Sequence, residues 1–167
     1  MSMLPPLTDP GALMKWWSSL YSDHSNLSNG ITFLHLAGLI VGGGAAVTTD
    51  RQILKAWRAG GDRRRGVLDD VSAVHVFVVG GLVLTIVTGA LMMLADWDTF
   101  SRSKLFWIKM AGVGVLIVNG AVLGWAERLA RQTSGSRGWP VLATVSTISL
   151  FFWLTVLGLG TWLKSVA

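Results

Sequence analysis

Four long apolar runs constrain the fold of this chain more than any other feature of the sequence. They cover residues 31–48, 71–94, 105–125 and 141–163. Each approaches the roughly 20 residues that an α-helix needs to cross about 30 Å of hydrocarbon, and none alternates as a β-strand does. Only helices and closed barrels satisfy the backbone in lipid, and the connections are short. The sequence therefore predicts an all-α integral membrane protein, an antiparallel four-helix bundle.

Composition and the N-terminal segment are consistent with a single membrane domain. Of the residues, 51% are hydrophobic and 14% charged. We place the transmembrane domain at residues 27–167 and a separate interfacial segment at residues 1–26. In that segment Asp9 is a capping residue before Pro10, and apolar residues follow at helical spacing. We expect a short amphipathic helix that lies in the membrane interface.

The distribution of basic residues predicts the orientation. Lysines and arginines concentrate between the first two runs and after the third, at Arg51, Lys55, Arg58, Arg63, Arg64, Arg65, Arg128, Arg131 and Arg137. By the positive-inside rule, these loops face the cytoplasm of a bacterium, so the protein lies in the inner membrane with both termini in the periplasm. The net charge of +5 then reflects topology and contact with anionic lipid rather than nucleic-acid binding. The absence of cysteine excludes disulfides, iron–sulfur clusters and covalently attached haem.

His35, inside the first apolar run, is the leading candidate for a functional residue. An imidazole at that depth is costly without a partner, and ionisable residues inside membrane helices are functional by default. Gly38 and Gly42 lie near the same helix face and could form a flat floor for a planar cofactor. These residues predict a b-type haem whose iron takes His35 as an axial ligand.

Further candidate ligands come from the second and third runs. Met92, Met93 and Lys109 should lie at the level of His35, so a thioether or an amine could be the sixth ligand, or that position could stay open. Lys109 and Arg102 could also meet the haem propionates near the interface.

His75 begins the second run at the opposite side of the membrane, very roughly 20 Å deeper than His35. It is a candidate for a second haem or a quinone site, or it only bonds a carboxylate or a carbonyl.

Each of these residues also has a structural interpretation. Glycines four residues apart often mark close helix contacts, and methionines often only fill a core. Lys109 could extend its amine to the membrane surface. Asn119, deep in the third run, is interpreted as a hydrogen-bonding residue between helices.

Part of the chain resembles a broad group of small bacterial membrane proteins that includes the copper-resistance D domain and the HemJ-type protoporphyrinogen oxidases. The resemblance runs from about residue 31 to 125 and rests on short motifs: Leu34-His35 with the glycines that follow, Asp50-Arg51, Thr88-Gly89, Phe106-Trp107-Ile108-Lys109, and Asn119. It implies that His35 corresponds to the first-helix histidine of the HemJ-type proteins, for which haem b binding is described. It also implies that Lys109 corresponds to their tryptophan-proximal lysine.

Three functional hypotheses follow. The first is an electron-transfer subunit that binds haem b. It would belong to a larger membrane complex and pass electrons between quinol and a periplasmic redox partner. The second is a structural subunit without a cofactor. The third is a transport accessory built on His35, Lys109 and Asn119, which the sequence disfavours because we expect no buried carboxylate.

Overall fold

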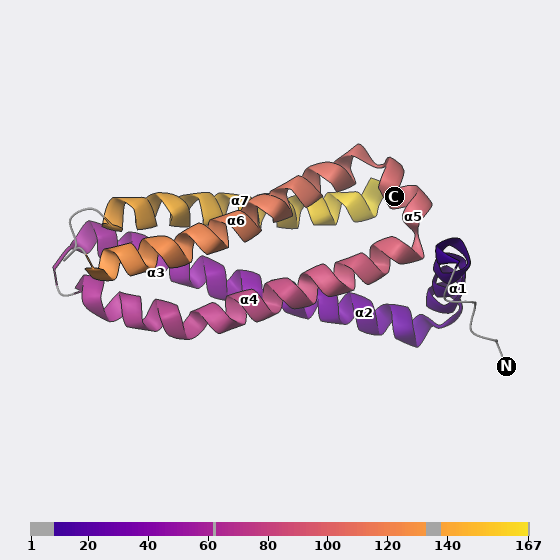
Figure 1. The fold of residues 1–167 in the computed structure, drawn as a ribbon, viewed down its shortest axis with the longest axis horizontal. Helices are drawn as coiled ribbons and strands as arrows, with labels where there is room; N and C mark the ends of the chain where they lie inside the picture. Colours follow the sequence, from indigo (N-terminus) through magenta and orange to yellow (C-terminus); the bar gives the residue numbers. More distant parts are fainter. Residues whose placement is uncertain (1–8, 62, 133–137, 167) are drawn as a thin grey trace.

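The computed structural model describes residues 9–61, 63–132 and 138–166. All regular structure in these ranges is helical (Figure 1). The elements are α1 (Pro10–Asp23), α2 (Ser25–Gly38), the π-helical turn η1 (Leu39–Gly43), α3 (Gly44–Ala59), α4 (Arg63–Ala95), α5 (Trp97–Arg102), α6 (Lys104–Gln132) and α7 (Gly138–Val166).

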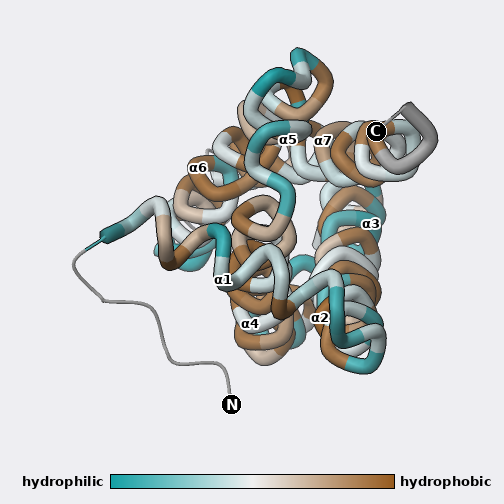
Figure 2. Tube along the Cα trace, turned by 90° about the vertical axis from the view of Figure 1, so that its right-hand side faces the viewer, coloured by the Kyte–Doolittle hydropathy of each residue, from teal (hydrophilic) through white to brown (hydrophobic). Residues whose placement is uncertain are grey.

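The prediction of four long apolar helices is confirmed. α2, η1 and α3 follow one another as one segment, and four segments of the described chain are long and apolar enough to cross a membrane: Ser25–Ala59, Gly66–Ala95, Lys104–Gln132 and Gly138–Leu163. Each contains one of the predicted runs and continues beyond it. Large apolar side chains also cover the outer faces of these helices, for example Ile40, which is 74% exposed, and Phe33, which is 69% exposed. Figure 2 shows apolar positions on the outside as well as the inside of the helices, which is the pattern expected for lipid contact.

The long helices pack in a ring that is open on one side. α6 packs along α7, α7 along α3, and α3 along α4, whereas α4 and α6 touch only sparsely. In Figure 1 these two helices lie close at the end where α6 finishes and separate towards α5. The gap between α4 and α6 positions the cavity described below.

Glycines allow the first membrane helix to approach α4 very closely. A Cβ atom at Gly42 would lie 3.0 Å from the Cα of Gly81, and one at Gly38 would lie 2.9 Å from the Gly81 carbonyl oxygen. The π-helical turn η1 lies at this crossing and includes Gly42. Gly38 contacts Thr85, whereas Gly42 contacts Gly81. Residue numbers therefore rise in opposite directions along the two helices. Backbone-to-backbone contact of this kind requires small residues on both helices.

The Gly81→Ala substitution should therefore destabilise the protein. Its Cβ would lie 2.5 Å from the Cα of Gly42, so the helices must separate, at an expected cost of about 1–3 kcal/mol. We expect a lower midpoint of thermal unfolding for the detergent-purified protein. The matched control is Gly80→Ala, because a Cβ at Gly80 meets nothing within 4 Å. An equal midpoint for both variants would contradict this account of the crossing.

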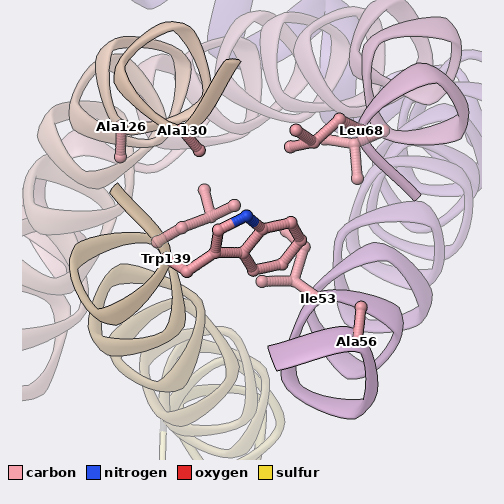
Figure 3. Packing of buried hydrophobic residues seen from close by; sticks show 8 residues of the cluster. Ile53, Ala56, Leu68, Ala126, Ala130 and Trp139 are labelled. Carbon is pink, nitrogen blue, oxygen red and sulfur yellow. The ribbon is translucent and has the colours of Figure 1, made fainter. Parts of the chain in front are cut away.

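A compact apolar cluster closes one end of the ring. It combines Ile53 and Ala56 of α3, Leu68 and Val71 of α4, Ala126 and Ala130 of α6, and Trp139 and Leu142 of α7. Figure 3 shows Trp139 lying across the space between these helices. Its indole is 1% exposed, and the guanidinium carbon of Arg64 lies 5.3 Å from its ring centroid. All four long helices are thus tied together at this end.

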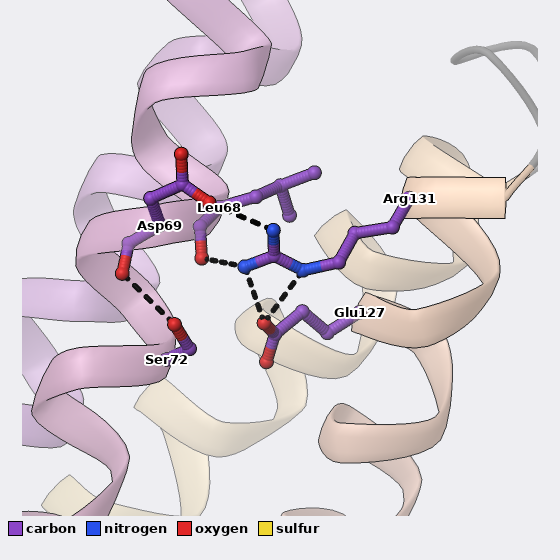
Figure 4. Close-up of polar contacts among 5 residues, drawn as sticks. All are labelled: Leu68, Asp69, Ser72, Glu127 and Arg131. Atoms are coloured by element: carbon purple, nitrogen blue, oxygen red, sulfur yellow. Dashed lines mark hydrogen bonds and ion pairs between the residues drawn. The ribbon is translucent and has the colours of Figure 1, made fainter.

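Arg131 links α6 to α4 beside this cluster (Figure 4). Its guanidinium donates to the Asp69 carboxylate at 2.8 Å and to the Leu68 carbonyl, and it also binds Glu127 one turn earlier at 3.0 Å. Because the Asp69 side chain is 78% exposed, the ion pair contributes little by itself. The link to the backbone carbonyl nevertheless holds α6 next to α4 where their gap begins.

At the other end, α1 is anchored to the last turn of α4. The Trp17 indole donates to the Leu91 carbonyl at 2.9 Å, and the Ser18 hydroxyl donates to the Ala95 carbonyl at 2.6 Å. The Ala95 carbonyl is one of those that the end of a helix leaves unpaired, so the Ser18 hydroxyl satisfies it. The Asp9 side chain caps the start of α1, with Pro10 in the first turn. α1 and the end of α7 lie at the same end of the bundle (Figure 1).

Candidate functional site

His35 is held in one orientation by α4. Its Nδ1 lies 3.0 Å from the hydroxyl oxygen of Thr88, and that hydroxyl donates its own proton to the Leu84 carbonyl at 2.6 Å. Thr88 can then only accept from His35, so the proton of the neutral imidazole lies on Nδ1. The lone pair of Nε2 is left to bind a metal or accept a hydrogen bond, as in histidines whose other nitrogen is fixed by a second residue.

The glycines assigned to a haem floor are covered by α4. A Cβ at Gly38 would lie 2.6 Å from the Thr85 hydroxyl oxygen, and Gly42 contacts the backbone of Gly81. Gly89 of α4 also lies against the imidazole, since a Cβ there would lie 3.1 Å from His35 Cε1. A ring bound to His35 therefore has no place over these glycines and must lie on the side of the imidazole away from α4.

The other residues assigned to the haem at His35 lie on three different helices, α4, α5 and α6. Lys109 is half-buried, and its Nζ lies 3.7 Å from the position of a Cβ at Gly160. Met92 and Met93 are half-buried in α4, one helical turn beyond Thr88, and Arg102 is exposed at the end of α5. The described residues contain no group of three or more His, Cys, Asp or Glu side chains placed to hold a metal ion.

His75 lies elsewhere, in the wall of a cavity between α4 and α6. It is 13 residues before Thr88 on the same helix, which at 1.5 Å per residue places the two histidines about 20 Å apart along the bundle. The cavity measures about 380 Å³, and α3 and α7 form its back wall. The volume is within the usual range for small-molecule sites.

The cavity is apolar at its mouth and polar at its inner wall. Val79, Val83 and Ile117 line it and remain exposed on the outer face of α4 and α6, which in a membrane faces lipid. The polar residues of the inner wall are Thr49, Asp50, Asn119 and Ser149, all buried. A hydrophobic ligand can thus enter from the bilayer and place a polar group against the inner wall.

Asp50 appears in our sequence analysis only as part of the Asp50-Arg51 motif, and its place in a candidate site was not predicted. It is 1% exposed, so the expectation that the chain has no buried carboxylate is wrong. Asp50 follows the first apolar run by two positions, and hydropathy alone suggests a helix end. The spacing of Ala46, Asp50 and Ile53 could have revealed the burial, because these residues share the inner face of α3.

Asn119 lines the same cavity, so the structure brings together His75, Asn119 and Asp50 but not His75 and His35. The sequence analysis treated Asn119 as a contact between helices. Its amide is buried on the open side of the ring and lines the cavity, and its role as a contact between helices stays a prediction.

Comparisons with protein-family models, curated proteins and solved structures find no match for this chain. The resemblance to the copper-resistance D and HemJ-type group therefore stays a prediction.

Proposed function

We propose that the chain is a membrane-embedded redox subunit that binds a quinone in the cavity between α4 and α6. This proposal rests on the distribution of apolar and polar residues in the cavity. Exposed valines line its lipid side, and buried polar groups line its inner wall. A quinone likewise has an apolar part and a polar part. Its isoprenoid tail is apolar, and its ring carries two oxygens that accept hydrogen bonds, or donate them in the quinol.

His75 and Asn119 are the side chains best suited to hold the quinone ring. An imidazole donates to a quinone carbonyl or accepts from a quinol hydroxyl, and an amide can do both. Trp153 at the back wall adds an aromatic surface for the ring. Interconversion of quinone and quinol moves two protons with two electrons, and a histidine is the side chain that exchanges protons most readily near neutral pH.

The proposal also includes the orientation of the bundle in the membrane and its protein partners. The bundle is antiparallel in a bacterial inner membrane, both termini face the periplasm, and α1 lies in the outer interface with its tryptophans at headgroup level. With little chain outside the helices, the electrons come from or go to protein partners in a membrane complex, one of them a periplasmic redox protein.

The His75→Ala substitution should weaken quinone binding about tenfold, the loss expected when one hydrogen bond of about 1.4 kcal/mol is removed. The measurement is titration of the purified protein in lipid nanodiscs with a short-chain quinone. His24→Ala is the matched control, because His24 is exposed at the junction of α1 and α2. Unchanged affinity in His75→Ala would remove the histidine from the site.

A b-type haem at His35 is the second candidate, favoured by the hydrogen bond from Nδ1 to Thr88 that leaves Nε2 free to bind iron. The group would supply one-electron redox chemistry, and Lys109 is the side chain that would meet a propionate. A reduced-minus-oxidised visible spectrum tests it. Haem bands that His35→Ala removes would support this candidate, whereas a colourless protein expressed with haem available would reject it.

A further inference from the structure

A cluster of buried oxygens lies at and behind the inner wall of the cavity, and no cation of the described residues pairs with it. Asp50 of α3 faces Ser146 and Ser149 of α7, whose hydroxyls lie near its carboxylate. All three side chains are buried, at 1%, 0% and 5% exposure respectively. Within the described part of the chain, no lysine or arginine forms an ion pair with Asp50.

Two of these oxygens lack hydrogen-bond partners. In the described structure, neither Oδ2 of Asp50 nor Oγ of Ser146 forms a hydrogen bond, although both are fully buried. Leaving a buried polar group unpaired costs about 1–3 kcal/mol, and more for a charged one. Two such oxygens on facing helices therefore indicate that something binds between them.

The chemistry of the cluster selects the ligand. Carboxylate and hydroxyl oxygens are hard donors that suit alkali and alkaline-earth cations rather than softer metals. The cluster carries one negative charge. A monovalent cation neutralises it, whereas a divalent cation would leave an uncompensated positive charge in a medium of low dielectric constant.

The route to the cluster is also defined. Towards the Ala59 end of the bundle, Ile53 follows Asp50 on α3 and Leu142 precedes Ser146 on α7, and both belong to the apolar cluster at 0% exposure. On the other side, Asp50 and Ser149 line the cavity. A cation therefore reaches the oxygens through the cavity.

We propose that Asp50, Ser146 and Ser149 form a binding site for a monovalent cation, with Na⁺ as the test ion. The site requires no ligand in the cavity, so the cation proposal can be tested independently of the quinone proposal.

The experiment compares thermal unfolding of the full-length protein, without added quinone, in NaCl and in choline chloride of equal ionic strength at pH 8. A ligand that binds only the folded state stabilises it as its concentration exceeds the dissociation constant. We expect the unfolding midpoint to rise with Na⁺ in the native protein and in the control Asp98→Asn, whose side chain is exposed on α5.

Two variants then locate the ion. Asp50→Asn should abolish the dependence on Na⁺, and Ser146→Ala, which keeps the charge, should shift it to about tenfold higher Na⁺, the effect of one lost ligand of about 1.4 kcal/mol. Equal midpoints in the two salts would overturn the proposal in favour of a bound water or proton. A dependence on Na⁺ that survives in both variants would also overturn it, since the ion would then bind elsewhere.

Discussion

The Gly120→Leu substitution is expected to abolish quinone binding and leave the fold intact. Gly120 of α6 lines the cavity, and a Cβ at this position meets nothing within 4 Å. The larger side chain therefore occupies the space proposed for the ligand without displacing a helix. We expect affinity to fall by about 100-fold or more, equivalent to about 2.7 kcal/mol. Titration with a short-chain quinone in nanodiscs measures the loss.

Gly124→Leu is the matched control for this prediction. Gly124 lies one turn further along α6, has the same open surroundings, and does not line the cavity. It should bind quinone as the native protein does, with the same unfolding midpoint as Gly120→Leu. If Gly120→Leu retained native affinity, the ligand would have to bind outside the gap between α4 and α6.

The largest loss of stability is expected for Trp139→Ala. Trp139 is 1% exposed, and its indole is packed among residues of all four long helices (Figure 3). Truncating a buried tryptophan leaves a void that rigid helices fill only in part, at a cost of about 3–5 kcal/mol. The ring contact with Arg64 is lost as well. Thermal or denaturant unfolding in a mild detergent measures the change.

Trp125→Ala provides the comparison, because Trp125 of α6 is 58% exposed on the outer surface. It should change the unfolding free energy far less than Trp139→Ala. Similar losses for the two variants would show that the apolar cluster at this end does not hold the bundle together.

The helical fold could be predicted because its signal is local. The apolar runs mark the four long helices, and Asp9 with Pro10 marks the start of α1. The helices extend further than the runs, since the α3 extension beyond Thr48 buries Ile53 and Ala56 on one face only. A hydropathy window averages over the faces of a helix and therefore ends the run too early.

The candidate sites depended on contacts between distant segments, and these could not be predicted. The sequence places His35 and Gly38 on one helix face but does not say that α4 covers that face. The hydrogen bond between His35 and Thr88 joins residues 53 positions apart. The cavity forms because α4 and α6 lie apart. Their separation depends on how all the helices pack and cannot be predicted from the sequence of one helix. The burial of Asp50 is different, because the spacing of Ala46, Asp50 and Ile53 on one face of α3 carries a signal that hydropathy alone does not use.

The quinone site is tested most directly by photo-crosslinking with an azidoquinone in lipid nanodiscs, followed by mapping of the labelled peptides. The account predicts labelling of α4 between His75 and Ile86 and of α6 between Leu116 and Leu123, with protection by excess unlabelled quinone. Labelling confined to α1, α2 or the outer ends of the helices, or labelling that excess quinone does not prevent, would contradict the account.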